Sequence, residues 1–427
     1  MNKKVSFYTL GCRLNQAETA ILQHSFAREG YDVVDYRQPA DIVVVNTCTV
    51  TANSDADTRK IVNKINRVNG DVQIALVGCQ AQVQKEKLLS LPNVRWVIGN
   101  GEKMNAANHL HNAGVDEPRV IAPVISRESF TIPVAGIDPK HTRANLKIQD
   151  GCDFFCSFCE IPYARGRARS RRFEDIFIEA RELVKAGHRE LVLTGINVGT
   201  YRYEAKNLVD VIAGLENIRG LKRIRISSIE PTTIAKAVLS GMVQKGKLCR
   251  YLHIPLQSGS DDILQKMNRN YSVAKFLEFL RQAHNQVENI CLGTDVIVGF
   301  PGETDEHFQQ TEDLLRELPF AYFHVFSYSD RHRALSRKLA VKVARPVIER
   351  RSRRLRELSV RKRRTYFENL IGLTETVLFE QKKKGYWTGL TDTYVRVKVK
   401  YNGDLQNRIL PVQLQAVDGQ TMTGKLV

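Results

Sequence analysis

A repeated alternation of strand-like and helical segments constrains the fold of this chain more than any other feature. From residue 145 onward, six short apolar runs recur, and helical patterns separate them. Repeated strand–helix units form a parallel sheet or barrel, because each crossover helix packs back onto the sheet. Six units are too few for a closed eight-stranded barrel, so we expect an open, partial (β/α)6 barrel. The predicted strands are Asn145–Gln149, Glu190–Thr194, Arg223–Ser227, Leu252–Leu256, Thr294–Gly299 and Tyr322–Phe326, with helices at about residues 173–187, 206–217, 232–244, 272–286 and 303–317.

The N-terminal part of the chain carries a second set of alternating segments. The predicted strands are residues 4–9, 41–46 and 73–78, and the predicted helices are about 15–28 and 54–68. The second and third strands are continuous apolar runs, which is typical of parallel strands buried on both faces. We therefore predict an N-terminal α/β domain with a parallel, Rossmann-like sheet.

A linker and a small barrel are predicted for the rest of the chain. No strong period appears in residues 100–140, which are punctuated by Pro118, Pro123, Pro133 and Pro139. After Leu370, short alternating segments with turns predict a five-stranded, OB-like β-barrel. We therefore expect three domains, at residues 1–125, 138–369 and 370–427.

Three cysteines follow the first predicted barrel strand. Cys152, Cys156 and Cys159 have the spacing C-x3-C-x2-C, so their thiolates can converge on one iron–sulfur cluster. Such a cluster usually takes four protein ligands, and three would leave one iron open to an exogenous ligand. The alternative is a loop with three free, buried cysteines.

Three further cysteines, Cys12, Cys48 and Cys79, each fall at the C-terminal end of a predicted N-terminal strand. Strand ends of a parallel sheet meet at one edge, where ligands bind, so these thiols are expected to form a second metal site. The alternative is three unrelated buried cysteines, which is how we interpret Cys249 and Cys291. The predicted barrel has further polar strand ends that could hold a small polar cofactor, at residues 194–197, 227–231, 257–260 and 299–303.

The formal net charge is +18, and the charge is clustered. Basic runs lie at residues 165–172 and 331–364, the second in a predicted helix broken near Pro346. Clustered guanidinium groups suit phosphate contacts, so we predict nucleic-acid binding rather than a merely solvated basic face. The predicted C-terminal barrel also mixes basic and aromatic residues, as RNA-binding surfaces do. These residues are Lys382–Lys384, Tyr386, Trp387, Arg396 and Lys398.

No run approaches the roughly 20 apolar residues of a membrane span, and residues 1–7 show no signal-peptide pattern. We therefore expect a cytoplasmic protein, whose eight cysteines are metal ligands or buried thiols rather than disulfides.

Taken together, these motifs resemble a known family. The C-x3-C-x2-C loop after a first barrel strand resembles that of the radical S-adenosylmethionine (SAM) enzymes. The order of Gly11-Cys12, Asn46-Thr47-Cys48 and Gly78-Cys79 before it, with a small TRAM-like barrel behind, is similar to the methylthiotransferases. The resemblance extends over essentially the whole chain and includes Leu256–Asp261 and Gly299–Glu303.

Within this family, three segments are similar to the MtaB type, which methylthiolates N6-threonylcarbamoyladenosine beside the tRNA anticodon. They are Thr9–Gln16, Asn46–Thr51 and Pro162–Arg171. Sibling enzymes act on isopentenyladenosine in tRNA or on an aspartate of a ribosomal protein. Glu160 departs from the expected apolar residue after Cys159, and its carboxylate could affect the potential of the cluster or access to it.

The resemblance implies that Cys152, Cys156 and Cys159 hold a [4Fe-4S] cluster whose open iron is chelated by SAM. Reductive cleavage of SAM would give a 5′-deoxyadenosyl radical that abstracts hydrogen from an adenine carbon. Cys12, Cys48 and Cys79 would hold a second [4Fe-4S] cluster that carries the sulfur, which a further SAM methylates. The candidate SAM contacts are Asn197, Ser228, Glu230 and Gln257.

The resemblance also implies partners: the tRNA anticodon stem-loop, gripped by the basic clusters and the C-terminal barrel, an electron donor and a sulfur donor. No residue is assigned a catalytic role beyond the cluster ligands. A non-enzymatic iron–sulfur protein that binds RNA is the alternative from another class.

Overall fold

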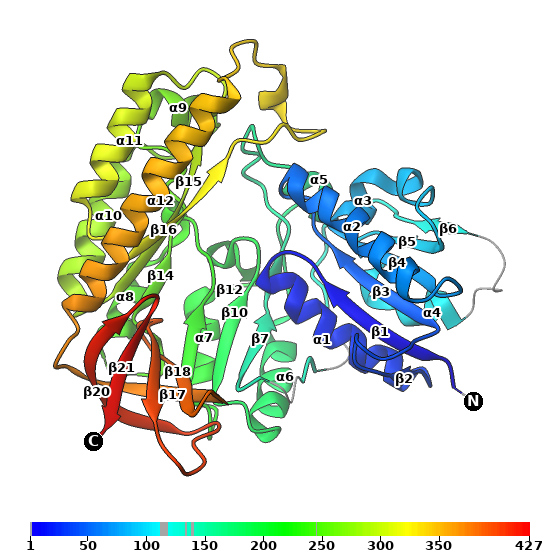
Figure 1. The fold of residues 1–427 in the computed structure, drawn as a ribbon, viewed down its shortest axis with the longest axis horizontal. Helices are drawn as coiled ribbons and strands as arrows, with labels where there is room; N and C mark the ends of the chain where they lie inside the picture. The colour runs from blue at the N-terminus through cyan, green and yellow to red at the C-terminus, as the bar shows by residue number, and fades with distance from the viewer. Residues whose placement is uncertain (1, 112–117, 133–134, 138–140, 245) are drawn as a thin grey trace.

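The computed structural model describes residues 2–111, 118–132, 135–137, 141–244 and 246–427. Pro133 and Pro139 of the predicted linker lie outside these residues, as does position 138, where the central domain is predicted to begin. In Figure 1 an N-terminal sheet lies to the right of a larger central α/β unit, and a small β-barrel lies below that unit.

The N-terminal sheet has six parallel strands in the order β2-β1-β3-β4-β5-β6. They are β1 (Lys4–Thr9), β2 (Asp32–Val33), β3 (Ile42–Thr47), β4 (Gln73–Gly78), β5 (Val94–Ile98) and β6 (Arg119–Ile121). Apolar residues of α1 (Arg13–Arg28) and α4 (Ala106–His111) pack on one face. Those of α2 (Ala52–Val68) and α3 (Cys79–Gln84) pack on the other face. The predicted parallel sheet is confirmed, but β2, β5 and β6 are additional to the three predicted strands.

The central unit contains six parallel strands in two hydrogen-bonded groups, which an isolated bridge between Ile224 and Leu248 connects. The strands are β7 (Arg143–Lys147), β10 (Glu190–Thr194), β13 (Arg223–Ile226), β14 (Tyr251–His253), β15 (Cys291–Val298) and β16 (Tyr322–Ser327). One continuous apolar core joins them to their helices. The helices are α6 (Phe173–Lys185), α7 (Leu208–Glu216), α8 (Lys236–Val243), α10 (Val273–Gln286) and α11 (Asp305–Glu317). The predicted partial barrel is therefore confirmed.

Short elements complete the loops of the central unit. They are β8 (Gln149–Asp150), α5 (Ile161–Arg165), β9 (Arg169–Ser170), β11 (Arg202–Tyr203), β12 (Lys206–Asn207) and α9 (Asp261–Lys266). Helix α1 of the N-terminal sheet packs against β7. The N-terminal sheet is thus docked beside the first barrel strand (Figure 1).

A long basic helix, α12 (Arg345–Glu368), lies along β16 and buries Leu355 and Leu358. The prediction of a helix on both sides of Pro346 is wrong, because residues 331–344 contain one short 3-10 turn, Leu335–Lys338, and Pro346 lies in the first turn of α12. A proline in the first turn lacks only an N–H that would have no partner within the helix, so it begins the helix without breaking it.

The C-terminal strands form a closed barrel in the order β17-β18-β19-β21-β20. They are β17 (Thr374–Lys383), β18 (Tyr386–Thr391), β19 (Arg396–Lys400), β20 (Ile409–Asp418) and β21 (Thr421–Leu426). The predicted five-stranded, TRAM-like barrel is confirmed. Trp387 is buried in the barrel core, where its indole N–H donates to the carbonyl of Gly403 at 2.8 Å. It is therefore not available to stack on a base, whereas Tyr386 is exposed.

Candidate functional site

Cys152, Cys156 and Cys159 lie in the loop between β8 and α5, near the C-terminal end of the first barrel strand. The loop turns back on itself, because the N–H of Cys159 donates to the carbonyl of Cys156 at 2.9 Å. Burial, together with the nearby Cys156 thiol, raises the pKa of Cys152 to about 11. Burial and both other thiols also raise the pKa of Cys159. The structure therefore brings the three thiols within electrostatic reach of one another.

Each of these three sulfur atoms accepts one hydrogen bond. Backbone N–H groups two residues further along the chain donate to Cys152 and Cys159, at 3.5 and 3.4 Å. The guanidinium of Arg269 donates to Cys156 at 3.1 Å. N–H donors stabilise sulfur that carries negative charge, so the loop suits metal-bound thiolates.

The segment that follows α9 holds the cysteine loop in place. Ser157 donates its backbone N–H to the carbonyl of Met267 at 2.9 Å and its hydroxyl to that of Lys266 at 2.8 Å. The side-chain amide of Asn268 donates to the carbonyl of Phe155 at 3.1 Å. These bonds hold the end of α9 and the turn after it against the cysteine loop.

Cys48 and Cys79 directly follow β3 and β4, and Cys12 lies three residues after the end of β1; the three strands are neighbours in the N-terminal sheet. Burial and the nearby Cys79 and Cys12 thiols raise the pKa of Cys48 to about 11. Gly11 has φ of +92°, and a Cβ there would lie 2.8 Å from the Cys48 sulfur. Only glycine lets the chain approach that sulfur so closely. The structure therefore brings this second set of thiols together at one sheet edge.

The chemistry of the two cysteine sets suits iron–sulfur clusters. Among the described residues, one group of three potential ligands, His253, Asp295 and His324, has its ligand atoms all within 4.8 Å of one another. Neither cysteine set forms such a group. A [4Fe-4S] cluster binds its thiolates through separate iron atoms, so it accommodates sulfur atoms that lie further apart. The residues present therefore fit such a cluster at each set.

The two cysteine sets meet at one boundary between the N-terminal sheet and the central unit. Cys79 and Val83 of α3 form an apolar cluster with Ala164 of α5, the helix that begins two residues after Cys159. The side-chain amide of Asn100 donates to the Cys79 sulfur at 3.4 Å and to the Ala164 carbonyl at 2.7 Å. The second set therefore packs directly on the helix that follows the first.

A buried group of charges fixes the same boundary. Glu18 of α1 accepts hydrogen bonds from Arg165 at 3.0 Å and from Lys147 at 2.7 Å. Asp150 also accepts from both, and Lys103 pairs with Glu18. Although burial opposes ionisation, these cations hold the pKa of Glu18 well below its usual range. Losing one partner would leave an uncompensated buried charge, so the arrangement keeps α1 docked on the barrel.

A cavity of about 480 Å³ opens where the three regions meet. Cys12 and Ser228 lie on its wall, and three arginines contribute to its lining: Arg13, Arg363 and Arg396. A smaller cavity of about 170 Å³ shares two of the lining residues, Asp295 and Phe326. Its other walls include Val50 and Thr51, just after Cys48, and Phe158, just before Cys159. Cys12 therefore lines the larger cavity, and residues close in sequence to Cys48 and Cys159 line the adjoining smaller one.

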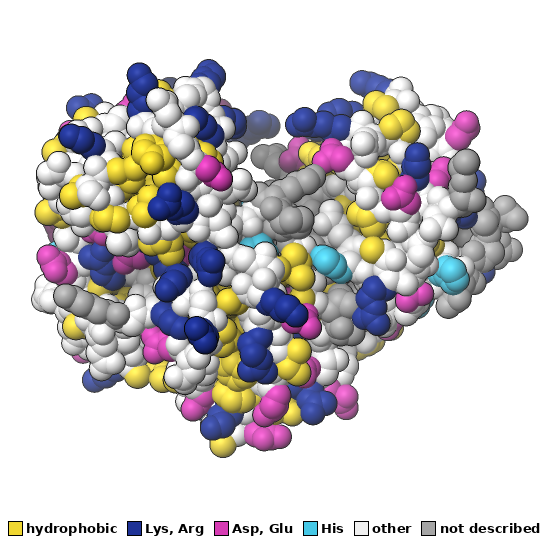
Figure 2. All heavy atoms as spheres, turned by 90° about the horizontal axis from the view of Figure 1, so that it is seen from below, with side chains coloured by type: hydrophobic (Ala, Val, Ile, Leu, Met, Phe, Trp, Pro, Cys, Tyr) yellow, Lys and Arg dark blue, Asp and Glu magenta, His cyan; other side chains and the backbone are white. Residues whose placement is uncertain are grey.

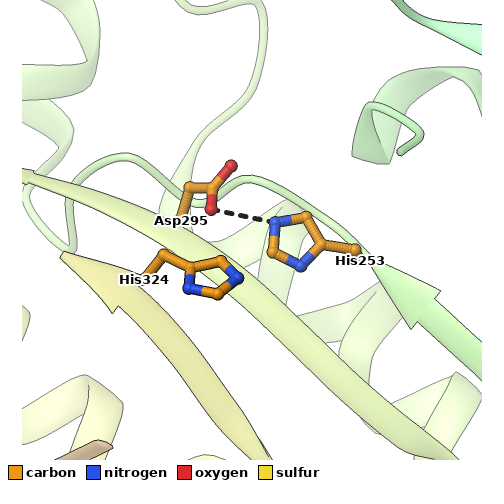
Figure 3. A group of neighbouring side chains, drawn as sticks. All are labelled: His253, Asp295 and His324. Carbon is orange, nitrogen blue, oxygen red and sulfur yellow. Dashed lines mark ion pairs between the residues drawn. The ribbon is translucent and has the colours of Figure 1, made fainter. Parts of the chain in front are cut away.

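Figure 3 shows His253, Asp295 and His324, which come from the adjacent strands β14, β15 and β16. The ring of His253 pairs with Asp295 through Nε2 at 2.9 Å, while Nδ1 lies 3.3 Å from the Tyr322 hydroxyl. Burial and the neighbouring His253 lower the pKa of His324, which favours its neutral form. All three side chains line the larger cavity, where they can hydrogen-bond a polar ligand.

The four candidate SAM contacts fall into three places. Asn197 accepts from the Glu230 N–H at 3.2 Å, and Arg269 pairs with the Glu230 carboxylate, so these two candidates lie beside Cys156. Gln257 lines the smaller cavity, and Ser228 lines the larger one. The side-chain N–H2 of Asn197 is buried without a partner among the described residues, which leaves it available to a ligand.

Some side chains at this site were not predicted from the sequence. Gln149 receives the N–H groups of Ile196 and Asn197 at 2.9 Å and donates to the Gly151 carbonyl at 2.8 Å, so it joins two strand-end loops. Arg165 and Arg269 were also not predicted in their roles, because each bonds residues that are distant in sequence. Arg165 belongs to a basic run that predicted phosphate contacts, but it is fully buried and pairs with carboxylates.

Figure 2 shows lysine and arginine side chains gathered in the middle of the lower face, the side on which the C-terminal barrel lies. Several arginines of α12 are exposed, including Arg353 and Arg361. No helix within the described residues has the length and apolar character required to cross a membrane.

Comparisons with known proteins agree with these features. A family model described as the radical SAM superfamily matches residues 146–315. A second model, described as uncharacterized protein family UPF0004, matches residues 4–99. The first match contains Cys152, Cys156 and Cys159, and the second contains Cys12, Cys48 and Cys79.

Three relatives match most of the chain. The threonylcarbamoyladenosine tRNA methylthiotransferase MtaB of Bacillus subtilis (strain 168) is 35% identical, over 96% of this chain and 93% of that protein. The MtaB of Aquifex aeolicus is 36% identical, over 92% and 96%. A tRNA-2-methylthio-N(6)-dimethylallyladenosine synthase of Clostridium botulinum (strain Eklund 17B / Type B) is 33% identical, over 78% and 75%.

Among solved structures, the chain resembles the radical S-adenosylmethionine methyltransferase TsrM from Kitasatospora setae, with a TM-score of 0.57. The alignment covers 77% of this chain and 75% of that one, at 16% identity, so the likeness is one of fold.

Proposed function

Because the chain belongs to the radical SAM tRNA methylthiotransferases, a family of transferases, we propose that it converts N6-threonylcarbamoyladenosine in tRNA to its 2-methylthio derivative. The substrate would be the anticodon stem-loop, and SAM would serve as both radical source and methyl donor. Relatives named for this substrate support the assignment, at 35 and 36% identity over nearly the whole chain.

The cationic lining of the larger cavity is the observation that carries the choice of substrate. Its lining includes Arg13, Arg363 and Arg396, against one carboxylate, Asp295, which is paired with His253. Within the described part of the chain, Arg13 and Arg363 pair with no carboxylate; they bond to Tyr394 and to Gln420. A threonylcarbamoyl group carries a carboxylate that such arginines can bind, whereas a dimethylallyl group is apolar.

The two cysteine sets would hold two [4Fe-4S] clusters, Cys152, Cys156 and Cys159 one and Cys12, Cys48 and Cys79 the other. When bound, the first cluster would pass on the electron that cleaves SAM, and the second would carry the sulfur that a separate donor provides. Support comes from the N–H donors to the sulfur atoms and from the adjoining cavities. We propose Asn197, Glu230, Ser228 and Gln257 as the side chains that bind SAM between them.

The remaining residues of the site would bind the substrate, orient it and shield it from water. The cavity between the three regions would exclude water from the adenine base, and its arginines would fix the threonylcarbamoyl group. We propose that residues 1–125 carry the sulfur-donating site, 138–369 the radical site, and 370–427 an RNA-binding barrel. The exposed basic side chains of α12 and β17 would contact the phosphates of the stem-loop, with an electron donor and a sulfur donor as further partners.

Mass spectrometry of tRNA nucleosides from a strain that lacks this gene tests the substrate. We expect the 2-methylthio form of threonylcarbamoyladenosine to disappear and the unmethylthiolated nucleoside to accumulate, with recovery when the gene is restored. Loss of methylthiolated isopentenyladenosine instead, or a ribosomal protein that loses a methylthio group, would overturn the substrate assignment.

The two-cluster proposal has its own test in purified, anaerobically reconstituted protein. We expect about eight iron atoms per chain, and about four after Cys12→Ala, because each [4Fe-4S] cluster holds four. Wild-type protein that holds only about four irons would remove the second cluster. Reductive cleavage of SAM by the reduced protein separates this enzyme from a non-enzymatic iron–sulfur protein that binds RNA.

A further inference from the structure

Glu160, the residue directly after Cys159, is buried at the boundary between the two cysteine sets, with 3% of its surface exposed. Its Oε2 lies 3.1 Å from Nε of Arg331 and 3.3 Å from the Thr49 hydroxyl. Its Oε1 accepts from the backbone N–H of Arg333 at 3.1 Å. A carboxylate at this unusual position is therefore bonded to the segment next to Cys48 and to the loop after β16.

Arg331 makes the complementary contacts from that loop. Its Nη2 donates to the Thr49 hydroxyl at 2.9 Å and to Asp55 Oδ2 at 2.6 Å. Thr49 directly follows Cys48 and is fully buried, and Asp55 lies in the first turn of α2. One guanidinium thus connects a carboxylate beside one cysteine set to a hydroxyl and a carboxylate beside the other.

The contacts extend to the third cysteine of the N-terminal set. The side-chain amide of Gln84 donates to Asp55 Oδ2 at 3.1 Å. Gln84 ends α3, the helix that begins with Cys79. Asp55 therefore connects the segment after Cys48 to the helix that begins with Cys79, and Arg331 connects both of them to Glu160.

The chemistry of this group favours one rigid arrangement. Arginine presents its donors in a fixed plane, so it can bond Glu160, Thr49 and Asp55 at the same time, which the single ammonium of lysine cannot match. Two partly or fully buried carboxylates face one cation, so moving the loops apart would leave charge buried without a partner. The separation of the two loops is therefore energetically fixed by side chains that are not themselves cluster ligands.

We propose that Arg331, Glu160, Thr49 and Asp55 form an interdomain clamp that sets the distance and orientation between the two clusters. The proposal rests on the proposed function, because it takes both cysteine sets to hold clusters. Sulfur held by the N-terminal set then meets the adenine carbon that is activated at the barrel set. The clamp residues are positioning residues, since they act through the loops that carry the ligands.

The conservative variants Arg331→Lys and Glu160→Gln test the clamp in the reconstituted holoenzyme. The Cys152 loop keeps its own support from Met267 and Asn268, so SAM should still be cleaved when the clamp is loosened. We expect the yield of methylthiolated product per 5′-deoxyadenosine to fall by about tenfold to a hundredfold, because small misplacements cost that much in reactions between positioned groups. The double variant should lose less than the product of the two single losses, since both single variants weaken the shared Arg331–Glu160 pair.

Two spectroscopic and structural readouts do not depend on turnover. The magnetic interaction between the two reduced clusters, measured by electron paramagnetic resonance, should become weaker or more widely distributed in strength in both variants. Hydrogen exchange should speed up in residues 48–55 and 157–165, in the holoenzyme and in cluster-free protein. The cluster-free measurement tests the clamp even if the proposed function fails, whereas iron content and wild-type turnover report on that function separately.

Arg143→Gln is the matched control, because it removes a half-buried interdomain ion pair, with Glu380 at 2.7 Å, on the side of β7 and β17. It should leave the cluster interaction and the exchange of residues 48–55 unchanged. An unchanged product yield and unchanged exchange in the clamp variants would overturn the proposal. So would an equal loss of SAM cleavage and product at unaltered exchange, since Glu160 would then act on the cluster potential alone.

Discussion

Arg269 links the cysteine loop of residues 152–159 to a candidate SAM contact through a single side chain. It donates to the Cys156 sulfur at 3.1 Å and pairs with the Glu230 carboxylate. Burial keeps the pKa of Glu230 above its usual range, although the arginine beside it acts in the opposite direction. Removing the arginine altogether would leave the Glu230 carboxylate without its cation. A substitution that keeps the positive charge is therefore more informative.

We predict that Arg269→Lys retains the iron but lowers the reduction potential of the cluster. Lysine cannot reach sulfur and carboxylate with one planar group, and a lost donor to sulfur favours the oxidised cluster. A charge-assisted hydrogen bond of about 1.5 kcal/mol corresponds to roughly 60 mV for a one-electron couple. A redox titration followed by electron paramagnetic resonance measures the shift. Arg250→Lys, which changes an arginine paired with Glu375 and Asp392, should leave the potential unaltered.

A second prediction concerns Arg363, which lines the larger cavity and bonds to Gln420 at 3.2 Å. We expect Arg363→Gln to raise KM for a stem-loop RNA that carries threonylcarbamoyladenosine by about tenfold, the effect of one lost charge-assisted bond. Binding of the same RNA with unmodified adenosine should change little. Titrations of both RNAs, with steady-state kinetics on the modified one, provide the comparison.

Arg361→Gln is the control for Arg363, because Arg361 lies on the same helix but is exposed and does not line the cavity. Its loss should weaken the binding of both RNAs to the same small extent, as expected for a phosphate contact. If Arg363→Gln also weakened both RNAs equally, Arg363 would be a phosphate contact rather than a ligand of the threonylcarbamoyl group.

Whether a residue of the site can be predicted from the sequence depends on whether its neighbours in the sequence form a recognisable pattern. Cys152, Cys156 and Cys159 are predictable because their spacing lies within one loop, and Cys12, Cys48 and Cys79 because each follows a recognisable strand. Arg269 and Arg331 carry no such local pattern. Their roles arise because Arg269 reaches Cys156 and Arg331 reaches Thr49 across the fold. Basic composition alone predicts solvent or phosphate contacts for them.

At the scale of elements, the turn that opens the cysteine loop depends on one glycine. Gly151 has φ of +70°, and a Cβ there would lie 2.0 Å from the backbone oxygen of Arg167. The next residue, Cys152, donates its N–H to the carbonyl of Gly166 at 3.1 Å. The loop is thus packed against the turn after α5 by backbone atoms, which cannot move aside as a side chain could.

We therefore predict that Gly151→Ala lowers the melting temperature and reduces the iron bound at the barrel site by more than half. A left-handed conformation costs an alanine about 1 kcal/mol, and the clash with Arg167 adds to that cost. Thermal unfolding and iron analysis of reconstituted protein measure the two effects. Gly30→Ala is the control: it has φ of +84° with no atom within 4 Å of the added Cβ, so it should lose about 1 kcal/mol and no iron.

Elements with a strong internal period are the ones that the sequence predicts. β10 spans the predicted residues because it is a continuous buried apolar run, and α10 begins within one residue of its prediction because its apolar positions define one face. β6 was missed: it has three residues, none of them buried, so no period can be detected. α12 was predicted with a break because proline is usually excluded from helices, but its position in the first turn removes that conflict.

At the scale of the whole molecule, side chains far apart in sequence decide how the regions are docked. Glu18, Lys147 and Arg165 come from three segments, yet they form one buried ionic group. At the other end, Arg225 donates to the carbonyls of Thr391 and Asp392 of the C-terminal barrel, at 3.0 and 2.7 Å. A sequence pattern gives each region separately, but these contacts become evident only when the regions are assembled.

The net charge of +18 leads to a prediction for the whole molecule in complex with tRNA. Each phosphate neutralised by a lysine or arginine releases a counterion, so affinity for the stem-loop should fall linearly with salt on logarithmic axes. We expect Arg353→Gln and Lys382→Gln, at exposed positions on α12 and β17, each to reduce that slope by about one. Fluorescence anisotropy with labelled stem-loop at several salt concentrations measures it. Lys64→Gln, exposed on α2 of the N-terminal sheet, should leave the slope unaltered; an equal effect of all three would mean that the RNA responds only to total charge.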